Sequence, residues 1–453
     1  MSLAAYSFAS GPAQLSRPRF PHPEGFDENL TISDVAVMMQ RALNCVDSRL
    51  VNHGLRVATI LDAMLAVKGT YDETQRRAAY FVALLHDIGA YRTEEIDRMV
   101  AFETEGVWEH SFYGFLFFRE LSPLVDYAEV VLFHHMDYDR FTGQSPQVKF
   151  LATALHVADR VDVLLLEHPQ AGAADVMRLM DAVRPGTFAP EALELFAEAE
   201  RRYGVLAYLR GGVEGPNPSR IVADPTGTGT ATSYLDMLVH IIDFRSRHTV
   251  THTVTTAWVA YELALRLLGD KGAAAHVYAS ALVHDVGKIG IPLSILEKPG
   301  RLDADEMAVM RTHVALTEGI LEGCVDPRML QAAVRHHEKL DGSGYPRGLQ
   351  ADELTVPDRI IAVADIVSAL VGTRSYKEAY PKEKVLMLLD EQQAAGKIDA
   401  AAVETMRRDY DAIMATVAQA CRPVADAYER VQQDYAWLLN ELEHARAVEG
   451  SKA

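Results

Sequence analysis

Histidine and aspartate residues recur in the second half of the chain in an order that suits metal binding. The order is one histidine, a His-Asp pair, one histidine, a His-His pair and one aspartate. These residues are His252, His284, Asp285, His313, His336, His337 and Asp365. Imidazole nitrogens combined with carboxylate oxygens suit divalent iron, manganese, nickel or zinc better than magnesium or calcium, which prefer shells made only of oxygen. The pattern therefore predicts a transition-metal site in this half of the chain.

The first half carries the same order of residues, displaced by roughly 200 positions. The matched residues are His53, His86, Asp87, His110, His134, His135 and Asp159. A nearly constant displacement across five chemically matched positions indicates an internal duplication. We therefore expect two copies of one fold, each with its own set of candidate metal ligands.

Helical patterns surround both sets of residues. Apolar residues such as Val254, Trp258 and Tyr261 repeat at helical spacing, and alternating strand patterns are scarce. A glycine- and proline-rich stretch over 211–233 cannot hold a regular helix and reads as a connector, with a short strand expected at 221–223. The expected fold is all-α, with two tandem helical bundles joined by this linker and a long C-terminal helix.

The pattern also predicts the extent of each part. We expect an extended N-terminal tail over 1–26, a first domain over 27–210, the connector over 211–233, a second domain over 234–423 and a terminal helix over 424–453. A helix over 30–50, with Ser33 as its N-cap, is expected to open the first domain.

The terminal helix has an apolar seam whose members are separated by alternating steps of four and three residues. Its members are Val424, Tyr428, Val431, Tyr435, Leu438, Leu442 and Ala445. Such a seam is typical of a coiled coil, and it also suits a helix that packs along its own domain. Both alternatives stay open from the sequence: packing within the chain, or a homodimer through this helix.

Composition narrows the class of protein. The 453 residues are 49% apolar and 24% charged, which is typical of a globular chain, and the formal net charge of −19 argues against duplex nucleic acid as a partner. The three cysteines, Cys45, Cys324 and Cys421, lie far apart, as expected in a reducing cytoplasm. No apolar run approaches the ~18 residues that span a bilayer, and no secretory signal is recognisable. A cytoplasmic protein that does not enter a membrane is therefore expected.

At these residues the sequence resembles the HD superfamily of metal-dependent phosphohydrolases. The second half resembles the HD-GYP branch, which contains bacterial cyclic-dinucleotide phosphodiesterases. The resemblance covers roughly 237–401 and rests on HDVGK over 284–288, HHEKLDGSGYP over 336–346, Asp365, and RSYK over 374–377. The first half resembles a plain HD domain with weaker local motifs.

The resemblance implies a role for each matched residue. Asp285 is expected to bridge two metal ions, whose remaining ligands are the histidines and Asp365 of the second half. Asp285 and Lys288 are the expected catalytic residues. An ammonium at Lys288 would stabilise charge on phosphoryl oxygens. The substrate contacts that the resemblance implies are Lys288, Gly344, Tyr345, Pro346, Arg374 and Lys377.

One ligand position departs from the family. Where the family commonly has Glu-Thr-Gly-x-His, with the glutamate serving a third metal, this chain reads HTVTH over 248–252. His248 and His252 share one helical face, so His248 either binds a third ion or leaves the site binuclear. We expect two divalent ions with a third as the open alternative, iron or manganese being favoured over nickel or zinc.

The first copy departs further. Ala90 stands where the second copy has Lys288, Arg49 stands where it has His248, and no glycine-tyrosine-proline loop follows His134 and His135. We expect a metal-stabilised, non-catalytic domain with a structural or regulatory function. A second phosphohydrolase of different specificity is the alternative.

The resemblance predicts an enzyme that hydrolyses a 3′,5′-cyclic dinucleotide to the linear 5′-phosphorylated dinucleotide in bacterial second-messenger signalling. Cyclic di-GMP is the first choice of substrate, and 3′,3′-cyclic GMP-AMP is the closest alternative because its phosphodiesterases share the tandem layout. A catalytically weak sensor or interaction module, with a GGDEF-type diguanylate cyclase as partner, is a different class of answer. A nucleotidase-like hydrolase is a third, which the long loop motif disfavours.

Overall fold

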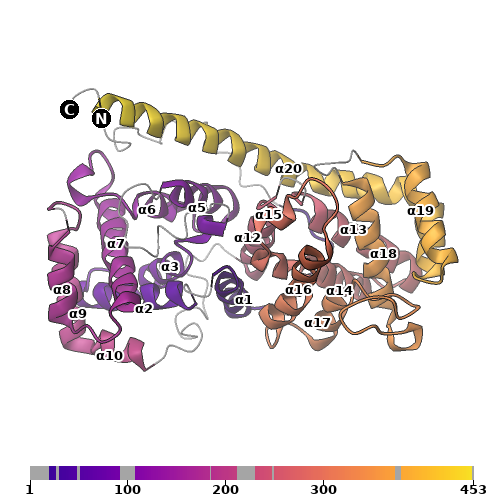
Figure 1. Cartoon of the computed structure of the whole chain (residues 1–453), viewed down its shortest axis with the longest axis horizontal. Helices are drawn as coiled ribbons and strands as arrows, with labels where there is room; N and C mark the ends of the chain where they lie inside the picture. The colour runs from indigo at the N-terminus through magenta and orange to yellow at the C-terminus, as the bar shows by residue number, and fades with distance from the viewer. Residues whose placement is uncertain are drawn as a thin grey trace. The chain divides into compact units, whose positions relative to one another are not determined.

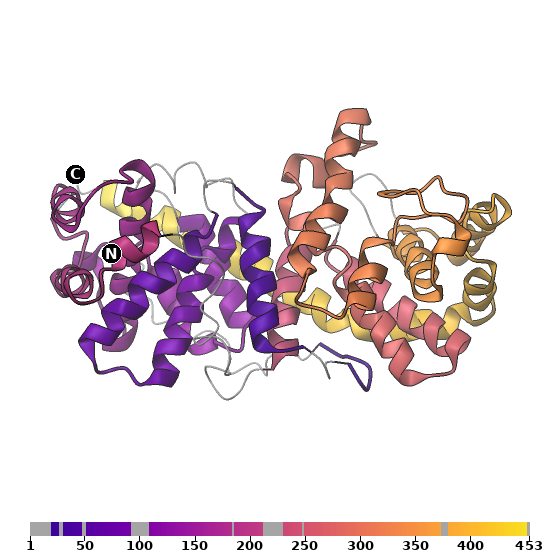
Figure 2. The ribbon, with the colours of Figure 1, turned by 90° about the horizontal axis from the view of Figure 1, so that it is seen from below.

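The structure is a computed structural model that describes residues 20–26, 30–47, 51–91, 108–183, 185–211, 230–246, 249–372 and 379–450. Every regular element within these residues is a helix, and one isolated bridge between Asp341 and Gln350 is the only pairing of extended backbone there. Figure 1 and Figure 2 show this helical architecture from two directions. The predicted all-α fold is confirmed.

The chain folds into two compact units. The first holds Asp47–Tyr234 and the chain from Glu429 onward, and the second holds Leu235–Tyr428 together with the described residues up to Val46. One division between the units lies near residue 234, and the predicted domain bounds themselves stay predictions. The division at residue 46 differs from the expected start of the first domain at residue 27.

The first unit is built around one long central helix, α7. Its elements are α2 (His53–Lys68), α3 (Glu73–Leu84), η4 (Ile88–Tyr91), α5 (Trp108–Leu121), α6 (Ala128–Phe133), α7 (Pro146–Glu167), α8 (Ala173–Asp181), α9 (Pro190–Tyr203) and α10 (Val205–Arg210). Helix α2 packs on α3, α7 and α9, and α5 packs on α6. The aromatic side chains of Phe81, Phe112, Phe118 and Phe133 are fully buried and form much of the core.

The second unit repeats this order of elements. They are α1 (Ile32–Asn44), α12 (Ala231–Asp243), α13 (His252–Leu268), α14 (Lys271–Leu282), η7 (Val286–Gly290), α15 (Leu293–Leu296), α16 (Ala304–Leu321), α17 (Pro327–Val334), α18 (Val356–Val371), α19 (Lys382–Ala394) and α20 (Ala400–Gly450). Helix α13 packs on α14 and α18 as α2 packs on α3 and α7. Both α2 and α13 begin at a candidate ligand histidine, and both end at a glycine with φ of 68°. This match supports the predicted duplication.

Helix α1 belongs to the second unit, although it precedes the first in sequence. The Arg41 guanidinium donates to the carbonyl oxygens of Ile320 and Glu322, at 3.2 and 2.5 Å, where α16 ends. Carbonyl oxygens at the end of a helix accept no hydrogen bond from a later turn, so the donations from Arg41 satisfy these two. The N-cap is Thr31, in a capping box with Asp34, rather than the predicted Ser33, and the helix ends at Asn44 rather than near residue 50.

The described end of the N-terminal segment is not an extended tail. His22 lies 3.1 Å from a carboxylate oxygen of Asp236 and 3.0 Å from the Tyr278 hydroxyl, and the buried Phe26 packs edge-on against Tyr278. Aromatic and charged contacts therefore fix residues 20–26 on the second unit. The predicted strand at 221–223 lies outside the described residues.

The terminal helix is the second part of a longer helix, α20, which has non-helical dihedrals at Asp409. Among the seam residues, Val424, Val431, Leu438 and Leu442 are buried within the chain. The Tyr435 ring stacks on Tyr113 of α5 with centroids 3.9 Å apart, and its hydroxyl donates to Glu109 at 2.9 Å. The seam therefore packs within this chain, which is the first of the two predicted alternatives. No helix in the described ranges is long and apolar enough to cross a membrane.

We predict that Leu438→Ala destabilises the first unit, because this side chain is only 1% exposed. The cavity left by a buried leucine costs about 2–5 kcal/mol of unfolding free energy. The neighbouring Leu439→Ala is the matched control, since Leu439 is only half-buried, and a smaller loss is expected. Thermal denaturation followed by circular dichroism measures both. An unfolding temperature that rises with protein concentration would contradict packing within one chain.

Candidate metal centres

The seven predicted ligands of the second unit converge at the ends and middle of its core helices. His252 begins α13, His284 and Asp285 follow α14, and His313 lies within α16. His336 and His337 follow α17, and Asp365 lies in the middle of α18. Residues more than a hundred positions apart are thereby brought into one cluster.

Asp285 lies at the centre of this cluster, and its two oxygens face different histidines. Its Oδ2 lies 3.0 Å from Nε2 of His252 and 3.0 Å from Nε2 of His284. Its Oδ1 lies 3.4 Å from Nε2 of His313 and 3.8 Å from Nε2 of His336. A carboxylate arranged in this way can bridge two cations, each completed by its own histidines.

Asp365 completes the cluster on its other side. Its Oδ1 lies 3.3 Å from Nε2 of His252, and its Oδ2 lies 3.6 Å from Nδ1 of His337. Two groups of potential ligands share this arrangement with Asp285, one made of His252, His284 and Asp365 and the other of His313, His336 and His337.

Backbone hydrogen bonds orient three of the histidines. Nδ1 of His284, His313 and His336 each lies within 2.6–2.7 Å of the carbonyl oxygen three residues earlier. A bond from Nδ1–H to that carbonyl leaves the Nε2 lone pair directed at Asp285, as in metal-ligating histidines. Within the described part of the chain, the buried His284 Nε2 and Asp285 Oδ1 have no hydrogen-bond partner. These orphaned atoms fit a bound divalent cation.

The charges of the cluster also suit cations. Burial would raise the pKa of Asp285, but His284 and Lys288 hold it well below its usual range. Burial would lower the pKa of His284, but Asp285 and Asp365 raise it to about 10. Burial lowers the pKa of His337 to about 3, so its nitrogens are free of excess protons. A cation replaces the proton on His284, so metal binding weakens as the pH falls.

A cavity of about 440 Å³ adjoins the cluster. Its lining residues are Thr249, His252, Lys288, Ile295, Leu296, Lys298, Gly300, Arg301, Leu302, Met307, Met310, His313, His337 and Tyr345. The Lys288 ammonium forms an ion pair with Asp285. The cavity lining therefore combines candidate metal ligands, the cationic side chains of Lys288, Lys298 and Arg301, and apolar side chains.

Tyr345 is held between two side chains at the mouth of this cavity. Its ring lies 4.6 Å from the His337 ring, and the Arg311 guanidinium lies 4.8 Å from its centroid. The loop that carries it is fixed by the buried Glu338, which accepts from the backbone N–H groups of Arg347 and Leu349 at 2.7 and 3.0 Å. Of the three predicted loop contacts, Tyr345 lines the cavity, whereas Gly344 and Pro346 shape the loop.

Gly344 is required by a close approach rather than by an unusual dihedral. A Cβ at this position would lie 2.5 Å from the backbone of Glu338 and of Lys339. Three other predicted residues, His248, Arg374 and Lys377, lie outside the described residues. Their roles as a third-metal ligand and as phosphate contacts stay predictions.

Sequence reasoning missed the groups that support the ligands. The hydroxyl of Ser368 lies 3.0 Å from Nδ1 of His252. The hydroxyl of Thr317 donates to the His284 carbonyl at 3.1 Å and accepts from the Gly287 N–H at 3.0 Å. Neither residue type is distinctive in sequence, although Ser368 could have been found because it lies one helical turn after Asp365.

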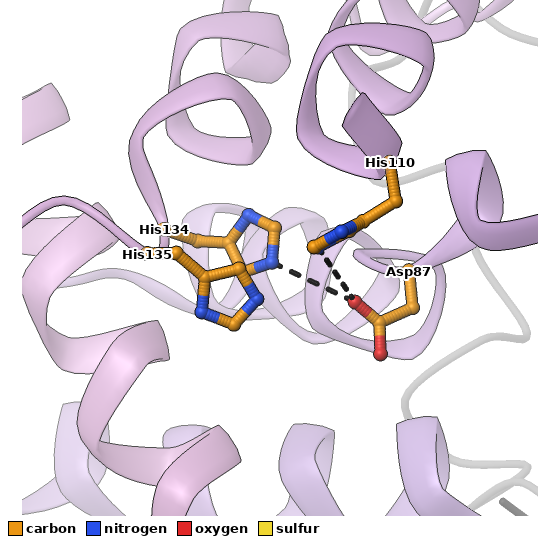
Figure 3. A group of neighbouring side chains, drawn as sticks. All are labelled: Asp87, His110, His134 and His135. Carbon is orange, nitrogen blue, oxygen red and sulfur yellow. Dashed lines mark ion pairs between the residues drawn. The ribbon is translucent and has the colours of Figure 1, made fainter. Parts of the chain in front are cut away.

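The first unit forms a second cluster of the same design from its seven predicted residues. Figure 3 shows the His110 and His134 rings directed at one oxygen of Asp87, Oδ1, which lies 3.6 Å from Nε2 of each. The other oxygen, Oδ2, lies 3.3 Å from Nε2 of His53 and 3.3 Å from Nε2 of His86. Asp87 therefore occupies the same bridging position as Asp285.

Two further ligands close the first cluster. Asp159 lies 3.3 Å from Nε2 of His53 through Oδ1 and 3.8 Å from Nδ1 of His135 through Oδ2. Both ring nitrogens of the buried His135, and Oδ1 of Asp87 and of Asp159, have no hydrogen-bond partner within the described ranges. These orphaned atoms fit bound cations in the first cluster also, where the buried Arg160 guanidinium shares Oδ2 of Asp159 at 2.8 Å.

The two clusters differ in what surrounds them. The side chain of His337 is 25% exposed and lines the cavity, whereas that of its counterpart His135 is 2% exposed. Ala90, at the position of Lys288, is buried. The first cluster lacks the open face of the second, and its neighbouring cation is the buried Arg160, which pairs with Asp159 rather than with the central aspartate.

Comparison with known proteins agrees with this geometry. Residues 50–181 and, separately, residues 236–402 match the HD domain family. The chain is a tandem HD-domain protein. The predicted resemblance to HD phosphohydrolases is confirmed in both halves, and each matched range contains one of the two clusters.

Curated relatives fall into two groups. The chain is 26% identical over 398 residues to 3′3′-cGAMP-specific phosphodiesterase 1 of Vibrio cholerae, which covers 84% of this chain and 92% of that protein. It is 38% identical over 164 residues to 3′3′-cGAMP-specific phosphodiesterase 3 of the same organism, and 36% identical over 153 residues to a cyclic di-GMP phosphodiesterase of Thermotoga maritima. These matches span 36% and 42% of those proteins.

A solved structure shares the fold over both domains. The crystal structure of a cyclic GMP-AMP specific phosphodiesterase of V. cholerae matches 84% of this chain and 98% of that chain. The TM-score is 0.51 at 21% sequence identity, so this likeness concerns the fold alone.

We predict that Gly287→Ala removes metal from the second cluster. A Cβ at residue 287 would lie 2.0 Å from the His313 carbonyl oxygen and 2.5 Å from the Thr317 nitrogen, so η7 and α16 must separate. Their separation moves His313 away from Asp285. Gly319→Ala on α16 is the control, because its Cβ meets nothing within 4 Å. Elemental analysis after loading with Mn²⁺ should show a loss in the first variant and none in the control; equal metal content would refute the packing argument.

Proposed function

We propose that this protein is a metal-dependent phosphodiesterase that hydrolyses 3′3′-cyclic GMP-AMP to the linear 5′-phosphorylated dinucleotide. The observation that carries the choice of substrate is similarity across both domains. The relative matched over 92% of its length is a 3′3′-cGAMP-specific phosphodiesterase. Relatives named as cyclic di-GMP phosphodiesterases match over shorter stretches, such as 33% and 35% of this chain.

This proposal departs from the first choice made from sequence. Cyclic di-GMP was the first choice because it is the usual substrate of the HD-GYP family that the second half resembles. The HD-GYP motifs lie in one domain and are shared by enzymes for both substrates, so they do not separate the two. The alternative substrate, 3′3′-cyclic GMP-AMP, was based on the tandem layout, and the similarity across both domains supports it better. Cyclic di-GMP is therefore the second candidate substrate.

The residues of the second cluster divide the chemistry between them. Two divalent cations held there, with iron or manganese favoured, would supply Lewis acidity and a water deprotonated near neutral pH. Asp285 and Asp365, both acidic with lowered pKa values, would hold these cations apart at a fixed spacing. The Lys288 ammonium lies beside Asp285, where it would stabilise negative charge on the phosphoryl oxygens as the bond to the 3′-oxygen breaks.

The cavity explains how a dinucleotide would be held. The Tyr345 ring lines the cavity between His337 and Arg311, and a nucleobase that took the place of the Arg311 guanidinium on this ring would gain about 1–3 kcal/mol by stacking. The apolar side chains of Leu302, Met307 and Met310 also line the cavity, so a base could pack against them. Both features support a substrate with two bases and an intervening phosphodiester.

A signalling module that binds the nucleotide without hydrolysing it is the rival function. Retention of Lys288 and Tyr345 in the cavity favours turnover, because binding alone does not require a cation beside the metal ligands. A GGDEF-type partner stays a prediction.

We predict that the full chain, loaded with Mn²⁺ or Fe²⁺, converts 3′3′-cyclic GMP-AMP to a linear product. The kcat/KM for this substrate should exceed that for cyclic di-GMP by at least about tenfold, which corresponds to ~1.4 kcal/mol of transition-state discrimination. Chromatography of timed reactions measures both. Equal or reversed preference would refute the choice of substrate, and no product from either would favour the binding module.

We predict separate kinetic effects for three cavity variants. Asp285→Ala should abolish hydrolysis, and Lys288→Ala should lower kcat by about 10²–10³, as loss of a charge-stabilising group does. Tyr345→Ala should chiefly raise KM, because the stacking surface is lost. Lys384→Ala on α19 removes a lysine that does not line the cavity and serves as the control. Unchanged kinetics of Asp285→Ala would overturn the site.

A further inference from the structure

The two clusters differ in the group that supports their first histidine. In the second unit, Nδ1 of His252 faces the hydroxyl of Ser368 at 3.0 Å. In the first unit, Nδ1 of His53 faces a carboxylate oxygen of Asp162 at 2.8 Å. The two supporting residues occupy equivalent positions, since each lies three residues after the second aspartate of its cluster.

An arginine fixes the carboxylate of the first unit. Arg56 Nε donates to Asp162 Oδ1 at 2.6 Å, and a second guanidinium nitrogen donates to Oδ2 at 2.9 Å. The Asp162 side chain is 0% exposed. The position equivalent to Arg56, the fourth residue of α13, is occupied by Thr255. The arginine and the carboxylate therefore occur together in the first unit and are replaced together in the second.

This difference changes the basicity of the histidine. A carboxylate that accepts from Nδ1–H increases the electron density at Nε2, and loss of such a partner typically costs 10- to 100-fold in metal affinity. A hydroxyl carries no charge and has a weaker effect. The forked contact with Arg56 holds both carboxylate oxygens in place, so the His53 ring has one orientation.

Access of solvent at the histidine of the His-His pair points in the same direction, whereas the central aspartate is more exposed in the first cluster, at 14% for Asp87 against 4% for Asp285. The His135 side chain is 2% exposed, whereas that of His337 is 25% exposed and borders the cavity. Release of a cation requires water or a chelator to reach its ligands. The first cluster is therefore both more basic at His53 and less accessible at His135.

We propose that Asp162, held by Arg56, is a positioning residue that retains cations in the first cluster, which thereby serves as a non-exchanging centre while the second exchanges its ions. The first domain then carries metal as part of its structure. The proposal concerns metal retention and does not depend on which dinucleotide the second unit hydrolyses.

The test measures the loss of Mn²⁺ from the full chain after addition of excess EDTA. Elemental analysis of desalted samples over time should show two phases, the faster from the second cluster and the slower from the first. Asp285→Ala should remove the fast phase, and Asp87→Ala should remove the slow one. Release in a single phase from the unaltered chain would overturn the proposal.

The support of His53 is then tested directly. The double variant Asp162→Ser with Arg56→Thr reproduces the residues of the second unit, and it should shorten the half-time of the slow phase by about 10- to 100-fold. The fast phase should not change. Asp162→Asn keeps the shape and removes the charge, so it should shorten the half-time even if the double variant fails to fold.

Glu167→Gln, at the exposed end of the same helix α7, is the matched control for loss of a carboxylate. Its release kinetics should equal those of the unaltered chain. A slow phase that persists unchanged in Asp162→Asn would refute the role of the carboxylate. A slow phase shortened equally by Glu167→Gln would assign the effect to net charge instead.

Discussion

A buried aspartate whose two oxygens face different histidines is the constraint on which each unit depends. Asp87 and Asp285 each face histidines from four separate helices or helix ends at fixed distances. The helices can satisfy this requirement only if they pack closely where the ligands meet. Glycine at positions 89 and 287 permits that packing, because a Cβ would lie 1.9 or 2.0 Å from the carbonyl oxygen of the facing histidine. The positions of the candidate ligands thus depend directly on how closely the helices pack.

The sequence indicated which residues come together because their types are rare in combination and their order is repeated. Fourteen residues placed in two sets by order alone meet in two clusters of matching geometry. The helical class was predictable for a similar reason, since apolar spacing is a local property of the chain. Substrate preference was less predictable, because motifs within one domain are shared by enzymes for both dinucleotides.

Long-range packing was the part that sequence could not predict. The position of α1 depends on Arg41 meeting the end of α16, and nothing local to either segment indicates that contact. The seam of α20 was visible as a heptad pattern, but its partner, α5, was not. The supporting residues Ser368 and Asp162 differ between copies although the ligands they orient are the same. The candidate ligands thus repeat between the two copies, whereas the residues that support them differ.

The placement of α1 has a consequence for dissecting this protein. A fragment that begins at residue 235 contains every described ligand of the second cluster, yet it lacks the guanidinium that satisfies the carbonyls at the end of α16. Helix α16 also carries His313, so fraying of its last turns would disturb the position of this candidate ligand. The second unit is therefore not contiguous in sequence as its motifs suggest, and a fragment designed to contain it needs the segment that carries α1 as well as the residues from 235 onward.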